Sequence, residues 1–165
     1  TQAMLRWMAP FLSFTAEEAW KVIHPQADSI FTETYLRLGT PDAALLARWA
    51  RVQAIREQVN KAIEAVRTEG GVGSSLQATV RIGAAADDLA LLRSLGDDLR
   101  FVLITSVAEV VEAPELTITV TPSKATKCER CWHWRDDVGH DAAHPGLCGR
   151  CTSNLFGAGE SRSIA

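Results

Sequence analysis

The chain has 165 residues, which is enough for one large domain or two small ones with a well-buried core. Its composition, 47% hydrophobic and 22% charged with 11 Gly and 6 Pro, excludes a disordered or fibrous chain. The net charge of −3 argues against a nucleic-acid binder that works through bulk positive charge. Residues 1–121 carry 11 basic and 15 acidic side chains, whereas residues 122–165 carry 6 and 5. Contact with a polyanion would therefore need a local patch.

The sequence does not predict a membrane segment. Its longest stretch without Asp, Glu, Lys or Arg is the 11 residues from 70 to 80, and a bilayer crossing needs about 20 apolar residues. The N-terminus lacks the basic and long apolar regions of a signal peptide and begins inside a predicted helix. We therefore expect a cytoplasmic piece of a larger protein.

The first part of the chain is predicted to be helical. Residues 1–9 are predicted to form the end of a helix that terminates at Pro10. The capping box at 15–18 (TAEE) predicts the start of a second helix. A loop with extended character at 29–32 leads to the Thr-Pro pair at 40–41, which suits the start of a long helix. In that helix one narrow apolar stripe runs until the Gly pair at 70–71: Leu45, Val52, Ile55, Val59, Ile63 and Val66.

A small α/β unit is predicted to follow. Residues 76–82 alternate apolar and polar side chains, which is the period of a half-buried strand. Two helices come next, then two strands on either side of a turn at 112–115: helices at 85–95 and 97–103, strands at 108–111 and 116–120. A polar connector (121–127) leads into the cysteine segment, and the small polar tail at 157–165 is expected to fray.

The predicted fold class is α+β. It comprises a helical bundle, a small α/β domain and a C-terminal four-cysteine zinc lobe of the ribbon or knuckle type. The corresponding domains are residues 1–72, 73–123 and 124–165.

All four cysteines lie in one segment, in two C-x2-C pairs separated by 16 residues: Cys128, Cys131, Cys148 and Cys151. Each pair suits a tight turn whose thiolates converge on one ion, and the gap lets two turns face each other. Gly149 suits the second turn because it lacks a Cβ. The pattern predicts one structural Zn²⁺, since four thiolates leave no open position for water or substrate.

Other interpretations of this segment stay open. His133, His140 and His144 make a site of three cysteines and one histidine conceivable, although the complete cysteine quartet argues against it. A packed or surface position suits His133 better. A dithiol redox pair is the other alternative, but two adjacent knuckles without a thioredoxin-like βαβ pattern fit it poorly.

Basic and aromatic residues alternate around the first knuckle. The candidate RNA contacts there are Lys127, Arg130, Trp132 and Arg135. Such a mixture is typical of a single-stranded nucleic-acid platform, on which bases stack on flat groups and cations meet phosphates. In a lobe with little core, one tryptophan of the pair Trp132 and Trp134 is expected to cover the metal site and the other to be exposed.

A second candidate RNA surface lies along one edge of the long helix. Trp49, Arg56, Asn60 and Arg67 are spaced by 7, 4 and 7 residues, which places them beside the apolar stripe. The alternative is a solvated edge with ordinary pairs such as Asn60 with Glu64. Trp49 is expected to be buried between helices.

Several segments in this order resemble isoleucyl-tRNA synthetase, at its C-terminal part. They include residues 59–67 (VNKAIEAVR), 72–76 (VGSSL), 127–133 (KCERCWH) and 147–151 (LCGRC), and near the start 9–11 (APF) and 15–20 (TAEEAW). The resemblance covers nearly the whole chain and implies an anticodon-binding helical bundle followed by a zinc lobe. It also implies that the four cysteines are the zinc ligands.

The resemblance implies two partners: the anticodon arm of tRNA(Ile) and the remainder of the synthetase chain. It also implies that the protein is a monomer. The signatures that bind ATP and the amino acid in such ligases, His-x-Gly-His and Lys-Met-Ser-Lys-Ser, are absent from these 165 residues. We therefore expect no catalytic residue here, and ATP would bind only in the parent enzyme's catalytic domain.

Two other functions are to be weighed against tRNA binding. A similar zinc lobe occurs in formamidopyrimidine-type DNA glycosylases, although the helical bundle in front argues for RNA. The other is a zinc ribbon that docks a protein partner through its tryptophans.

Overall fold

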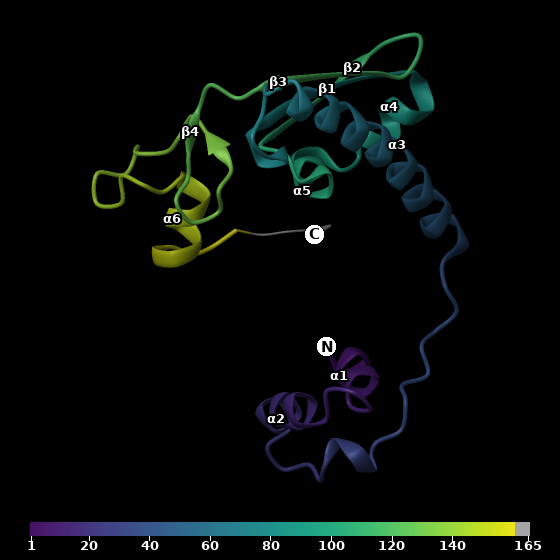
Figure 1. Cartoon of the computed structure of the whole chain (residues 1–165). Helices are drawn as coiled ribbons and strands as arrows, with labels where there is room; N and C mark the ends of the chain where they lie inside the picture. Colours follow the sequence, from purple (N-terminus) through teal and green to yellow (C-terminus); the bar gives the residue numbers. More distant parts are fainter. Residues whose placement is uncertain (161–165) are drawn as a thin grey trace. The chain divides into compact units, whose positions relative to one another are not determined.

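The computed structural model describes residues 1–160, in two compact units, one of residues 1–42 and one that begins at residue 43 (Figure 1). None of the helices within the described range combines the length and the apolarity that a membrane crossing needs. The predicted fraying of the tail concerns residues 157–165, of which 161–165 lie outside the described residues. In residues 157–160 the Glu160 amide donates to Asn154 Oδ1 (2.8 Å) and Arg150 pairs with the Glu160 carboxylate (2.7 Å), while the fraying itself stays a prediction.

The first unit is a pair of short helices, α1 (Gln2–Met8) and α2 (Ser13–Ile23), followed by a 3₁₀ helix (Ile30–Thr32). Trp20 is almost fully buried at its centre. Its core consists of Leu5, Ala9, Ala16, Trp20 and Ile30.

Two predictions for this unit are wrong in detail. Helix α2 begins two residues before the predicted capping box, with Leu12 as its N-cap residue and no side chain capping it. The Glu17 carboxylate instead accepts from the Ile30 amide (2.8 Å) and from Ser29 Oγ (3.1 Å). With Ser29 also accepting from the Phe31 amide, the segment predicted to be extended turns into the 3₁₀ helix.

Helix α3 (Ala43–Thr68) is the longest element. It ends where predicted, because Gly70 takes the left-handed φ of +79° and the Gly71 amide donates to the Val66 carbonyl (2.9 Å). The middle of the predicted stripe is buried: Val52, Ile55, Val59 and Ile63. Leu45, however, is 46% exposed, so the stripe covers less of the first turns than the periodicity predicted.

A three-stranded sheet lies at the centre of the second unit: β1 (Ala78–Ala84), β2 (Val107–Glu112) and β3 (Thr117–Pro122). The strand order is β2-β1-β3, with β1 parallel to β2 and antiparallel to β3. The turn between β2 and β3 lies where predicted, but these two strands do not pair with each other. Strand β1 begins two residues later than predicted, after a 3₁₀ helix (Ser75–Gln77).

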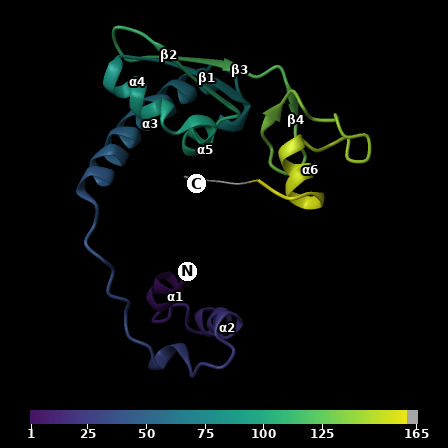
Figure 2. The same ribbon diagram turned by 180° about the vertical axis from the view of Figure 1, so that it is seen from behind.

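Helices α3, α4 (Ala86–Arg93) and α5 (Leu99–Leu103) pack on one face of this sheet (Figures 1 and 2). The alternation of β1 supplies that face with Val80 and Ile82, which are fully buried. Their partners on the neighbouring strands are apolar as well: Ala108 and Val120 beside Val80, Val110 and Ile118 beside Ile82. The first part of the predicted helix at 97–103 is a 3₁₀ turn (Gly96–Asp98).

The cysteine lobe has its own small elements: β4 (Thr126–Lys127), β5 (Trp134–Arg135) and α6 (Gly149–Phe156). Strands β4 and β5 form a two-stranded antiparallel sheet. The predicted mixture of helices and small sheets with a four-cysteine cluster is confirmed. The three-domain division stays a prediction, and helix α3 shares one core with the sheet.

Candidate metal centre and nucleic-acid interface

The first cysteine pair lies in the tight turn between β4 and β5. The Cys128 amide donates to the His133 carbonyl (2.9 Å), and the Trp132 amide donates to the Cys128 carbonyl (2.9 Å). These two bonds fold residues 128–133 into a loop that points Cys128 and Cys131 to the same side.

The second pair lies at the N-terminus of helix α6. Cys148 is its N-cap residue and Cys151 lies in its first turn, where the helix dipole favours negatively charged thiolates. At Gly149 the close neighbour is a carboxylate and not the metal site: a Cβ would lie 3.0 Å from Asp137 Oδ2, which accepts from the Gly149 amide (3.1 Å).

The two turns bring the four cysteine sulfurs within 4.8 Å of one another. Cys128, Cys148 and Cys151 are buried and Cys131 is half-buried, and all four are free thiols. The Sγ atoms of Cys131 and Cys148 are 3.8 Å apart, and Cys128 Sγ accepts from the Cys148 amide (3.4 Å). This donor set fits a closed tetrahedral zinc–thiolate centre that holds one Zn²⁺.

The thiols differ in acidity. Burial acts to raise the pKa of the Cys128 thiol, but the backbone amides of Cys131 and Cys148 outweigh it and bring that pKa to about 6. Burial raises the pKa of Cys131 to about 12, helped by the neighbouring sulfurs, and burial also raises the pKa of Cys148. Zinc binding must therefore displace protons from this cluster.

The histidines do not join this group. Within residues 1–160, the four sulfurs are the only set of three or more potential ligand atoms that meet in one place. His133 Nδ1 lies 3.1 Å from the Cys131 carbonyl, and burial lowers the pKa of the imidazole. His144 stacks on Phe156 at 3.9 Å. The preferred packed position of His133 is thus the one that the structure shows.

Trp132 presents an exposed aromatic surface beside the cysteine turn. The residue is 59% exposed and has a φ of +63°, which is strained for a side chain of this size. Its indole N–H donates to the Glu129 carbonyl (3.1 Å), and the Lys127 ammonium lies 5.4 Å from the ring centroid. The backbone and one hydrogen bond hold the ring in place with a cation next to it.

Trp134 has the opposite environment. It is half-buried, and its amide donates to Ser106 Oγ (2.6 Å), whose hydroxyl donates in turn to the Leu76 carbonyl. Of the two tryptophans, Trp132 is therefore exposed and Trp134 half-buried, and the backbone amide of Trp134 is bound to Ser106, just before β2. Ser106 could not be predicted from the sequence, because its role depends on residues 28 and 30 positions away.

The two arginines of the predicted face differ from each other. Arg130 is exposed, and its Nη1 lies 3.6 Å from Cys151 Sγ. Arg135 is only 30% exposed and lies 3.6 Å from an Asp137 carboxylate oxygen. Lys127, Arg130 and Trp132 thus offer accessible groups, whereas Arg135 is partly neutralised.

The residues of the helix edge lie on α3, which packs against the sheet, and not on the cysteine lobe. Asn60 is exposed, and Arg56 is half-buried with a buried Nε that has no hydrogen-bond partner. Arg67 pairs with Glu64 through two bonds (2.9 and 2.5 Å), so Glu64 has a partner other than Asn60.

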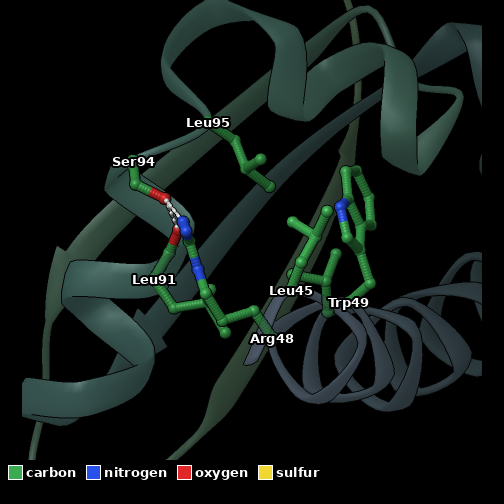
Figure 3. A pocket seen from close by; sticks show the side chains of 7 residues that line it. Leu45, Arg48, Trp49, Leu91, Ser94 and Leu95 are labelled. Atoms are coloured by element: carbon green, nitrogen blue, oxygen red, sulfur yellow. Dashed lines mark hydrogen bonds between the residues drawn. The ribbon is translucent and has the colours of Figure 1, made fainter. Parts of the chain in front are cut away.

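A pocket of about 430 Å³ opens between α3 and α4 (Figure 3). Trp49 is half-buried in its wall, and Arg48 donates to Ser94 Oγ (3.2 Å). The described residues that line this pocket include no carboxylate, thiol or imidazole, so it offers no acid–base or metal chemistry: Leu45, Arg48, Trp49, Val52, Leu91, Ser94 and Leu95.

Two family models match the chain. The family described as the anticodon-binding domain of tRNA ligase matches residues 1–82. The family described as a zinc finger found in FPG and IleRS matches residues 126–154, which contain all four cysteines. The first match favours a tRNA ligase over a repair glycosylase.

Individual relatives agree with these models. The chain is 57% identical over 173 residues to isoleucine–tRNA ligase of Cupriavidus metallidurans, 60% over 177 residues to that of Bordetella petrii and 56% over 168 residues to that of Thiobacillus denitrificans. Each alignment covers 100% of the chain but only 18 to 19% of the relative. The chain therefore belongs to the isoleucyl-tRNA synthetase family, of which it forms the C-terminal anticodon-binding and zinc-finger region.

Proposed function

We propose that this chain binds the anticodon arm of tRNA(Ile) and so supports the ATP-dependent attachment of isoleucine to tRNA by the full-length ligase. The observation that carries the proposal is the match of residues 1–82 to an anticodon-binding domain, joined in one chain to the four-cysteine centre. The chain acts within the remainder of the synthetase, as a monomer in the cytoplasm.

The zinc ion is proposed to be structural and held by Cys128, Cys131, Cys148 and Cys151. Four thiolates complete its coordination, so it has no position for water or substrate and no part in bond making. Its task is to fix the loop that carries Trp132 and the N-terminus of α6. The lobe has little apolar core beyond the cysteines, with Val138 and Leu147 packed against them, so the metal supplies much of its folding energy.

The RNA surface is proposed to centre on Trp132, flanked by Lys127 and Arg130. The exposed ring offers a flat face for a nucleobase, and the two cations are close enough to the loop to meet phosphates. Arg135 contributes less, because Asp137 lies beside it.

The helix-edge residues Arg56, Asn60 and Arg67 remain part of the proposed surface. For Arg67 to meet a phosphate, it must exchange its Glu64 partner. Breaking the Arg67–Glu64 pair costs little free energy, because exposed ion pairs contribute little to stability.

The proposal is tested by titrating labelled tRNA(Ile) with the zinc-loaded chain at several salt concentrations. Each phosphate contact made by a cation contributes about −0.9 to the slope of log K against the logarithm of the salt concentration. The five candidate cations therefore set the steepest expected slope at about −4.5. A slope near zero, or affinity for tRNA(Ile) equal to that for an unrelated tRNA, contradicts anticodon-arm binding. The exposed tryptophan would then be better explained as a contact to a protein partner, whose binding does not depend on salt concentration.

A further inference from the structure

A group of arginines closes over the inner side of the cysteine centre. Arg100 comes from α5, Arg135 from β5 and Arg150 from α6. Together with two of the cysteines they line one small cavity: Arg100, Phe101, Cys131, His133, Arg135, Cys148 and Arg150. Of these groups, Arg100 and Phe101 belong to the α/β domain, so the cavity lies where that domain meets the lobe.

Arg100 is the buried member of this group. It is 8% exposed, and its Nε is buried without a hydrogen-bond partner. Its ion-pair partner, Asp97 at 3.0 Å, is 85% exposed, so water screens much of that carboxylate's charge. A cation this deeply buried requires a stronger counter-charge nearby.

The other side chains around the cavity do not supply that charge. Burial lowers the pKa of the Arg100 guanidinium, and the positive charges of Arg135 and Arg150 lower it further. The face of Phe101 gives a cation–π contact to Arg100 (4.7 Å), but Arg150 lies at 4.9 Å from the same ring. The residues that line the cavity include no carboxylate, and the nearby carboxylates of Asp137 and Glu160 pair with Arg135 (3.6 Å) and Arg150 (2.7 Å) rather than with Arg100.

A soluble anion such as phosphate does not fit into the cavity as the counter-charge of Arg100. The cavity measures about 10 Å³, which is the room of about one water molecule, so a phosphate group is too large. Cys131 and Cys148 line the same space. When zinc is bound to four thiolates, that centre carries a net charge of −2.

We propose that Arg100 is a positioning residue of the zinc centre, whose charge stabilises the negative zinc–thiolate group and thereby ties the zinc lobe to helix α5. The proposal rests on the zinc ligands given under the proposed function. Two further contacts join the same surfaces: Phe101 meets His133 edge to face at 5.5 Å, and the Trp134 amide donates to Ser106 Oγ. Zinc loading and lobe docking are therefore coupled.

The first test compares zinc affinity in three variants by competition with a chromophoric chelator. Arg100→Met, which removes the charge, should weaken zinc binding about 10-fold or more, in the range typical of outer-shell partners of a metal site. Arg100→Lys keeps the charge and should stay within about threefold of the wild type. The matched control is Arg81→Met, on an exposed position of β1. Equal losses in Arg100→Met and Arg100→Lys, or no loss in either, overturn the proposal.

The second test separates charge compensation from simple packing. The melting temperature of Arg100→Met should be lower than that of the wild type when both are loaded with zinc, and the difference should nearly vanish when both are chelated. An equal difference in both states means that Arg100 acts by packing alone, which overturns the proposal. Failure of the wild type to bind one equivalent of zinc would instead contradict the proposed function, so the two failures are distinguishable.

Discussion

At the scale of single residues, Trp132 combines features that a merely structural residue does not need. A left-handed backbone costs about 1–3 kcal/mol for a residue other than glycine. Trp132 has this backbone conformation although the residue remains 59% exposed. The indole N–H bond to Glu129 and the nearby Lys127 ammonium fix the orientation of the ring. Such preorganisation lowers the entropy cost of stacking a base.

Replacing this ring tests its role. Trp132→Ala should weaken tRNA(Ile) binding about 5- to 100-fold, because stacking of one base contributes about 1–3 kcal/mol. Trp132→Phe should recover part of the loss, since it keeps an aromatic face. Binding is measured by fluorescence anisotropy and zinc by elemental analysis. If Trp132→Ala keeps its zinc and binds as tightly as the wild type, the stacking role is wrong.

Arg130 provides an independent check on the phosphate contacts. Arg130→Ala should weaken binding to all RNA sequences about equally and flatten the salt slope by about one unit. Because Arg130 Nη1 lies 3.6 Å from Cys151 Sγ, zinc content is the necessary control. A variant that retains zinc and has an unchanged salt slope would remove Arg130 from the interface.

At the scale of elements, the contact between α3 and α4 carries a pH-dependent ion pair. Arg51 on α3 binds Asp88 on α4 through two bonds (2.7 and 2.5 Å), and these bonds hold the pKa of the Asp88 carboxyl below its ordinary value. Since the pKa is lower in the folded state, the stabilisation is complete above pH 4 and is lost as the pH falls through the folded pKa.

Asp88→Asn should therefore lower the free energy of unfolding by only about 0.5 kcal/mol at pH 7, because Arg51 is 47% exposed and water screens the pair. The difference from the wild type should disappear near pH 3. Urea denaturation at both pH values measures it, with the neighbouring exposed Asp87→Asn as the matched control. A difference that is independent of pH would show that the pair is not its source.

The cysteine lobe should unfold as an element of its own. Cys128→Ser removes one of four ligands and should abolish tight zinc binding and the fold of the lobe, because the metal supplies most of its folding energy. The helices of residues 1–69 should remain. Circular dichroism and zinc analysis measure the two effects. Loss of the whole helical signal would show that the lobe and the helices fold as one unit.

The features that the sequence predicted are those set by neighbours in the chain. Gly70 ends α3 through its own φ, and the C-x2-C spacing already contains the geometry of each cysteine turn. The capping box at 15–18 is different: it fits the local pattern, but helix α2 begins at Ser13 without a side-chain cap, and the Glu17 carboxylate accepts from the Ile30 amide, 13 residues away. Arg100 gives no local signal either, because its environment is made by segments from three parts of the chain.

At the scale of the whole molecule, net charge limits how the proposed RNA binding can work. The net charge of −3 means that general attraction for RNA is weak, so the proposed affinity has to come from a local surface such as the one around Trp132. The chain spans about 18% of the length of its relatives, and the signatures for ATP and amino-acid binding are absent from it. We therefore expect no isoleucine-dependent pyrophosphate exchange by this chain alone, and exchange above background would contradict this.

A chain that binds the anticodon arm but performs no chemistry should be a competitor of the intact enzyme. Added to a full-length relative, it should raise the apparent KM for tRNA(Ile) without changing kcat, because it removes free tRNA and does not touch the catalytic site. Pyrophosphate exchange without tRNA should be unaffected, which serves as the internal control. Trp132→Ala should inhibit about 5- to 100-fold less well, in proportion to its lost affinity. A fall in kcat, or equal inhibition by the variant, would mean that the chain acts on the enzyme and not on its tRNA.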